Sequence, residues 1–287
     1  MVIEHDNKNR STPMALFWAD THADGEVLVP QQRARSQWSN AGQLRGAAVS
    51  GALARAAERA ANGLPHADGF RAVRWTLDLF RPAATMPCRT QAAVVRQGRR
   101  LRLVDATILQ EDKVVARASL LLLAGRGRTS GTTWAGPRTH PSTPPPGLRP
   151  ATTEPTLYFS EEIGWTDTPA PHHNASRKMT WHLPAEIVAD EPVTPFQHVA
   201  SIADASNLVA NWGDSGVEYI NADVSLHLLR IPHETDGVGI SALERAEEDG
   251  IALATTVLYD RNGHLGQVEL SAIANGANAV DPRKFGL

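Results

Sequence analysis

The sequence predicts an α+β fold in which one module occurs twice, each copy holding a long helix followed by an antiparallel meander of strands. The first observation behind this prediction is an internal repeat, because residues separated by 149 positions match along the chain. The second is an Ala-rich stretch in each half, and the third is the run of alternating segments that follows it. The repeat aligns Ala54 with Ala203, Leu77 with Leu226 and Arg81 with Arg230.

The first helix is expected over residues 43–62, which are rich in Ala, Leu and Arg. Gly63 and Pro65 follow as stop signals. The small Ala and Gly side chains keep this helix thin, as expected if a sheet wraps closely around it. Alternating or β-rich segments then predict strands at residues 70–80, 89–97, 100–110 and 114–123.

The second half repeats this order, with its helix expected over residues 194–212. Its strands are expected near residues 218–229, 237–247, 251–260 and 264–274. Asn262-Gly263 marks a tight hairpin turn between the last two strands. Helices do not alternate with strands, so the predicted class is α+β and not α/β.

A stretch rich in Gly, Ser, Thr and Pro separates the two halves. Because proline lacks a backbone donor and favours extended backbone, this stretch is expected to cross the surface as a connector. The predicted domains are therefore residues 15–125 and 156–276, with a linker at residues 126–155.

Length and composition limit the possible functions. The 287 residues suffice for two domains, and a net charge of −3 creates no field that favours nucleic acid or an anionic membrane. The single cysteine, Cys88, excludes an internal disulfide and suits a reducing compartment. The longest apolar run, near residues 118–124, is too short to span a membrane, and residues 1–14 lack the apolar core of a signal peptide. We expect a soluble, cytoplasmic protein.

No motif predicts a cofactor or a metal ion. The chain has no G-x-S-x-G, no G-x-G-x-x-G after a strand and no P-loop, which argues against an α/β-hydrolase and against dinucleotide or NTP use. His172-His173, the only close histidine pair, lacks metal-ligand spacing. We therefore expect neither a cofactor nor a metal.

Several segments resemble those of a known family. Residues 70–119 carry segments similar to DLxRP, VxRxGRR and VARA in that order, and YINADVSLHLLRIP (219–232) and LYDRNGHLG (258–266) follow the second helix. Together with the order of elements, they resemble the double-hotdog acyl-CoA thioesterases of the thioesterase II type over roughly residues 15–275. The resemblance implies a double-hotdog fold, in which each sheet wraps one helix, and an acyl-CoA substrate. We also expect self-association into a homo-oligomer.

The resemblance also implies where an active site lies. The family places an Asp late on the second helix, a Thr on the next strand and a Gln on the last strand. The matching positions hold Asn207, Asn221 and Ser271, or Gln267 if the register of the last strand shifts. The family's His-Gly-Gly before the first helix corresponds to Leu44-Arg45-Gly46. No carboxylate therefore stands where the family has its Asp.

Thioester hydrolysis needs a positioned water, a proton acceptor and donors for the developing oxyanion. The helix starts near Gly46 and Pro195 supply free N–H groups and a partial positive charge. Asp204, one turn before Asn207, is one candidate base, although it could instead make a structural hydrogen bond or face solvent.

Glu58, the first-half counterpart of Asn207, is the other candidate base. Its alternative is an ion pair with Arg55 or Arg59 on a solvated face of the helix.

Further residues are candidates for substrate binding. Asp223 and Asn221 share one face of a strand, and this face either lines the acyl-CoA site or faces solvent. A basic run that includes Arg99 and Arg100 either meets the coenzyme A phosphates or is a solvated hairpin.

The sequence favours hydrolysis of an acyl-CoA by direct attack of water, because no activated Ser or Cys nucleophile is apparent. One rival is a degenerate hotdog protein that binds an acyl ligand without turning it over. A hotdog hydratase or dehydratase is weaker, because the His22…Gly25 spacing and the predicted strand position of Asp223 do not fit its motifs.

Overall fold

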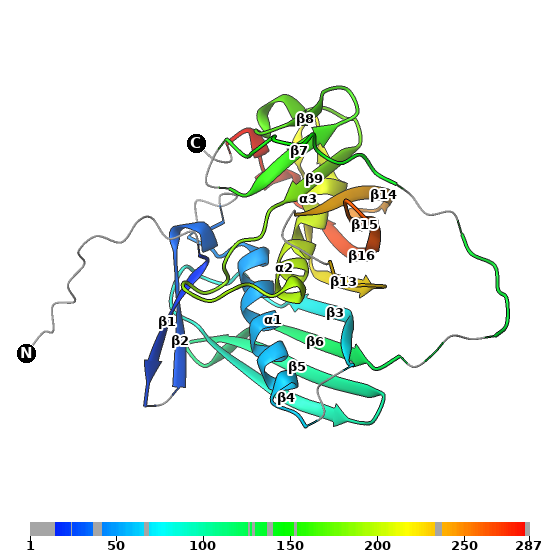
Figure 1. Cartoon of the computed structure of the whole chain (residues 1–287). Helices are drawn as coiled ribbons and strands as arrows, with labels where there is room; N and C mark the ends of the chain where they lie inside the picture. The colour runs from blue at the N-terminus through cyan, green and yellow to red at the C-terminus, as the bar shows by residue number, and fades with distance from the viewer. Residues whose placement is uncertain are drawn as a thin grey trace, which may run out of the picture.

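The computed structural model describes residues 15–284, apart from residues 24, 37–41, 66–68, 126, 128–129, 137–139, 152–153 and 233–236. In the first half, a hairpin and a short 3-10 helix precede the long helix and its meander (Figure 1). These elements are β1 (Phe17–His22), β2 (Gly25–Pro30), η1 (Gln32–Ala34), α1 (Gly46–Asn62), β3 (Arg71–Leu79), β4 (Arg89–Gln97), β5 (Leu101–Gln110) and β6 (Lys113–Leu123). Parts of the predicted linker lie outside the described residues, and the domain boundaries stay a prediction.

The second half opens with β7 (Thr156–Ser160), β8 (Gly164–Thr166), η2 (Ala170–His172) and β9 (Lys178–His182). Its helical part is α2 (Pro195–Ile202), η3 (Ala203–Ala205) and α3 (Ser206–Asn211). Its remaining elements are β10 (Trp212–Gly213), β11 (Gly216–Val217), β12 (Tyr219–Asn221), β13 (Asp223–Leu228), β14 (Val238–Glu248), β15 (Ile251–Asp260), β16 (Gly263–Ala274), η4 (Gly276–Asn278) and η5 (Pro282–Lys284).

One antiparallel sheet of 12 strands runs through both halves. Its order is β4-β5-β6-β3-β13-β16-β15-β14-β9-β7-β8, and β12 pairs with β16. Helix α1 packs on β4, β5 and β6 and against α2, while α3 packs on β14 and β15 (Figure 1). The predicted α+β arrangement is confirmed, but the two predicted sheets are joined into one where β3 pairs with β13.

A local two-fold relation links the halves. At the join, Thr76 pairs with Ser225, 149 residues further along the chain. Helix α1 begins at Gly46 and ends at Asn62, and the α2–α3 segment begins at Pro195 and ends at Asn211, which is the same offset at both ends. The sequence repeat therefore corresponds to a real structural repeat.

The second predicted helix is interrupted. Thr194 caps α2, since its side chain accepts a hydrogen bond from the Gln197 N–H at 3.1 Å, and Pro195 occupies the first turn. At Ala203–Ala205 the helix tightens into a 3-10 turn before α3 continues it. Asp204 lies in this tightened turn.

Strands β7, β8 and β9 have no counterpart in the predicted meander. They extend the sheet beyond β14, to which β9 pairs. Leu157 and Trp181 anchor them by packing with Tyr259, whose ring centroid lies 5.8 Å from that of Trp181. These strands supply part of a pocket wall that the sequence analysis missed.

Close packing joins the two central helices. Ser50 on α1 donates to the Ala200 carbonyl at 2.7 Å and accepts from the Trp75 indole at 3.0 Å. A Cβ at Gly51 would lie 2.6 Å from the Ile187 Cδ1, so a larger residue here would require the end of that side chain to move. No helix within the described part of the chain is long and apolar enough to cross a membrane.

Candidate active site

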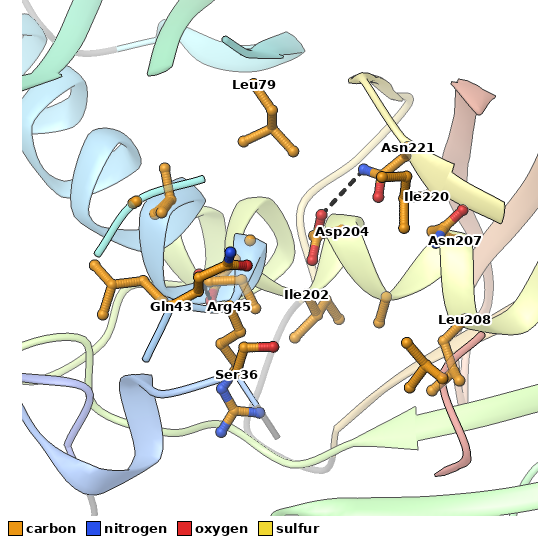
Figure 2. A pocket seen from close by; sticks show the side chains of 18 of the residues that line it. Ser36, Gln43, Arg45, Leu79, Ile202, Asp204, Asn207, Leu208, Ile220 and Asn221 are labelled. Carbon is orange, nitrogen blue, oxygen red and sulfur yellow. Dashed lines mark hydrogen bonds between the residues drawn. The ribbon is translucent and has the colours of Figure 1, made fainter. Parts of the chain in front are cut away.

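A pocket of about 1020 Å³ lies at the start of α1 (Figure 2). It is lined by the loop before α1, the end of β3, one face of α2–α3, strands β7 and β9, and residues 273–281. Both halves therefore contribute to it. Its volume is at the upper end of the range for small-molecule sites, which is about 300–1,000 Å³.

Asp204 and Asn221 meet in this pocket. The Asn221 Nδ2 donates to Asp204 Oδ1 at 3.1 Å, the dashed contact in Figure 2. The backbone of Ala47, in the first turn of α1, also acts on this carboxylate and lowers its pKa. A Cβ at Gly46 would lie 2.5 Å from the Asp204 Cγ, so only glycine lets the carboxylate approach the helix start this closely. Of the residues predicted for the site, Gly46, Asp204 and Asn221 all line this pocket.

The surroundings of Asp204 shift its acidity. Burial raises the pKa of its carboxyl above the ordinary value, against the lowering effects of Asn221, Arg45 and Ala47. The side chain is nevertheless half-buried by area, because it faces the pocket. A carboxylate with a raised pKa is a stronger proton acceptor than an ordinary one.

Asn207 lines the same pocket, but its amide is engaged in a structural chain of hydrogen bonds. Its Nδ2 donates to the Tyr219 carbonyl at 3.0 Å, and its Oδ1 accepts from Asn211 at 2.8 Å. Asn211 in turn accepts from Arg245 at 2.8 Å. The residue that contacts Asn221 is Asp204.

Ser271 and Gln267 lie elsewhere. Both are on the face of β16 that alternates with the buried residues Val268, Leu270 and Ala272, and neither lines the pocket. Asp223 also lies outside the pocket lining, where its Oδ1 accepts from the Ser271 N–H at 2.8 Å. The expected grouping of Ser271 with Asn207 and Asn221 is not formed, because Ser271 is exposed and lies outside the pocket lining.

Glu58, on α1, lies against the start of α2. It accepts hydrogen bonds from Thr194 and Gln197, both at 2.8 Å, and burial raises the pKa of its carboxyl. It does not line the pocket.

The alternative ion pairs for Glu58 are not formed either. Arg55 pairs with Glu26 at 2.6 Å and with Glu191 at 2.7 Å, and Arg59 joins the same two carboxylates. Arg55 lies 149 residues before Asp204, so the position equivalent to Asp204 holds a buried cation in an ionic cluster.

Arg99 and Arg100 lie in the exposed turn between β4 and β5, far from the pocket. The next arginine, Arg102, hydrogen-bonds to the Pro65 carbonyl just past the end of α1. A 17-residue helix is roughly 25 Å long, and the pocket lies at its other end. The structure therefore corrects their expected position. The exposed arginines that do line the pocket are Arg35 and Arg81.

Four buried polar residues on the pocket wall escaped the sequence analysis. They are Thr156 and Tyr158 on β7, His182 on β9 and His198 on α2. The alternation of polar residues in TLYFS and KMTWH could have found the first three, but no such signal marks His198. Among the described residues, no group of three His, Cys, Asp or Glu side chains could hold a metal ion.

Two repeats of one helix wrapped by an antiparallel sheet, with a pocket at a helix start, define a double-hotdog protein. Comparison with solved structures supports this class. The tesB protein of Mycobacterium avium subspecies paratuberculosis is 20% identical over 86% of this chain and 92% of its own, with a TM-score of 0.61. A hot dog protein of unknown function from Alicyclobacillus acidocaldarius is 16% identical over 89% and 95%, with a TM-score of 0.57.

A thioesterase is also similar in fold. The acyl-CoA thioesterase II of Mycobacterium marinum is 13% identical over 89% of this chain and 94% of its own, with a TM-score of 0.59. No curated protein matches the sequence. The predicted double-hotdog fold is confirmed.

Family models identify the chain more closely. Residues 34–123 match the acyl-CoA thioesterase N-terminal domain, and residues 131–269 match the acyl-CoA thioesterase C-terminal domain. The chain belongs to the thioesterase II-like family of acyl-CoA thioesterases. The predicted family and the predicted enzyme class, a thioester hydrolase, are confirmed.

Proposed function

We propose that the protein hydrolyses an acyl-CoA thioester by direct attack of water, with Asp204 as the general base. The observation that carries this proposal is the position of Asp204, a carboxylate of raised pKa that faces the pocket and contacts both Asn221 and the start of α1. This constellation supplies a proton acceptor, an orienting amide and a helix N-terminus at one point.

In the proposed reaction, a water held by Asp204 and oriented by the Asn221 amide attacks the thioester carbon while Asp204 takes its proton. The carbonyl oxygen becomes an oxyanion, stabilised by the partial positive charge at the start of α1. There the Gly46 N–H has no acceptor among the described residues. The intermediate then collapses, the C–S bond breaks, and Asp204 returns the proton to the leaving thiolate.

Arg35 and Arg81 are proposed to bind the phosphates of coenzyme A. Both are exposed at the pocket, and no described residue pairs with either guanidinium. A planar guanidinium suits phosphate oxygens. Arg99 and Arg100, the sequence-based candidates, lie at the wrong end of α1 for this role.

The test is thiol release from acyl-CoAs of two to sixteen carbons, measured with a thiol reagent for the native chain, Asp204→Asn and Glu58→Gln. We expect native activity, loss of at least about a hundredfold in Asp204→Asn, and retention in Glu58→Gln. The two substitutions match, since each replaces a buried carboxylate by its amide at a helix start.

Full activity in Asp204→Asn would refute the assignment of the base. Binding of acyl-CoA without release of thiol by the native chain would instead support the degenerate binder. A cytoplasmic location, self-association and a role in lipid metabolism stay predictions.

A further inference from the structure

One wall of the pocket is polar and deeply buried. We define the polar wall as Thr156, Tyr158, His182 and His198, all of which line the pocket and are at most 8% exposed. Thr156 and His182 pair across β7 and β9, so their side chains share a sheet face with Tyr158. Elsewhere the lining is largely apolar, as at Leu44, Val49, Leu79, Ile202 and Leu208.

The polar wall carries no net charge at neutral pH. Burial lowers the pKa of His182 to about 3 and that of His198 to about 4, so both rings are neutral. Beside this wall, Glu154 accepts two hydrogen bonds from Arg45, at 2.9 and 2.7 Å, and the buried guanidinium of Arg33 lies near the same carboxylate. An ammonium group on a ligand would therefore find no free counter-ion here.

Two groups on the polar wall lack a partner within the described structure. The His198 Nε2 is buried without a hydrogen bond, while its ring hydrogen-bonds to the backbone of His182. The Tyr158 hydroxyl also has no hydrogen-bond partner. Its oxygen atom is not completely buried, so it keeps access to the pocket. Buried polar groups are nearly always paired in native proteins, and an unpaired one costs about 1–3 kcal/mol.

Tyr158 does not lie beside the reacting carbon. It packs in a cluster with Leu208 and Trp212, four and eight residues after Asp204. These separations correspond to roughly 6 and 12 Å along a helix. We therefore expect a group that meets the Tyr158 hydroxyl to lie several carbons along the acyl chain.

We propose that the acyl group carries a neutral oxygen function, a hydroxyl or keto group remote from the thioester, which accepts a hydrogen bond from Tyr158. This inference rests on the proposed function and names its substrate class. A plain alkyl chain leaves the polar wall unsatisfied and an ammonium group has no free counter-ion, whereas a neutral oxygen satisfies the wall without either penalty.

The test compares octanoyl-CoA with its 3-hydroxy, 5-hydroxy, 7-hydroxy and 8-hydroxy derivatives, using kcat/KM from thiol release. We expect a remote hydroxyl isomer to exceed both octanoyl-CoA and the 3-hydroxy isomer by about tenfold or more, the value of one buried hydrogen bond. Tyr158→Phe should reduce that ratio about tenfold. Tyr259→Phe is the matched control, because it removes another buried phenol, bonded to the Ser142 carbonyl outside the pocket, and should leave the ratio unchanged.

Hydrolysis of octanoyl-CoA without preference for any remote isomer would overturn this inference and leave the proposed function standing. The same holds if Tyr158→Phe lowers kcat/KM equally for all five esters. If the native chain hydrolyses none of them, the proposed function fails. Calorimetric binding of the same esters then decides whether this inference holds. Tighter binding of a remote hydroxyl isomer that is lost in Tyr158→Phe would support the inference, and equal binding would overturn it.

Discussion

Replacing Gly46 with alanine tests whether the carboxylate of Asp204 must sit against the start of α1. The new Cβ would lie 2.5 Å from the Asp204 Cγ, while carbon atoms prefer separations of about 3.5–4.0 Å. The carboxylate must therefore retreat by about 1 Å. A misplacement of this size costs roughly a hundredfold in rate, or about 2.7 kcal/mol of transition-state stabilisation. We expect kcat/KM to fall by that factor, although alanine favours the helix itself.

The assay is thiol release from the best acyl-CoA, with melting temperature measured in parallel. Gly63→Ala is the control, because its Cβ would meet only backbone oxygens of α1 at 3.7 Å, an ordinary contact. We expect native kcat/KM in this variant. Native activity in Gly46→Ala, with an unchanged melting temperature, would show that the contact between Asp204 and the helix start does not support catalysis.

Three further outcomes are expected. Because burial raises the pKa of Asp204, its ionisation destabilises the fold as pH rises through that pKa. The melting temperature of Asp204→Asn should therefore equal that of the native chain near pH 4 and exceed it at pH 8, and equal melting temperatures at pH 8 would contradict this. The double variant Arg35→Ala with Arg81→Ala should raise KM about threefold to tenfold, and less at high salt, whereas Arg99→Ala with Arg100→Ala should leave KM unchanged. Equal effects of the two double variants in steady-state kinetics would exclude the assigned phosphate site. Arg55→Ala should cost about 3 kcal/mol in urea unfolding, because it leaves Glu26 and Glu191 with only the exposed Arg59 as a partner, and Arg59→Ala should cost less than about 1 kcal/mol. The reverse order would contradict the burial of Arg55.

The repeated helices could be predicted because their signals are local. The Ala-rich stretch that ends at Gly63 and the Thr194-Pro195 start of α2 both follow from capping and propensity rules. The four-strand meanders follow from alternation in the same way. Strand β7 was missed because it follows a proline-rich stretch and is only five residues long, so its alternation competes with a linker interpretation.

The site could be predicted only in part, because its contacts are tertiary. The sequence marked Asp204, Asn221 and Gly46 as candidates, but their meeting depends on the 3-10 turn at Ala203–Ala205 and on the packing of α1 against α2. The predicted place of Ser271 in the site was wrong, because the position of a strand residue depends on register and bulges, which a resemblance between sequences does not fix.

The ionic cluster around Arg55 has a consequence that depends on the covalent link between the halves. Two identical subunits must repeat every side chain on both sides of their dyad, so a carboxylate at one helix start would appear at the other. Here the equivalent positions hold Asp204 and Arg55, an anion and a cation. Such a charge inversion is open only to a fused pair, which can keep one half-site for chemistry and use its twin to fasten the β1–β2 hairpin through Glu26.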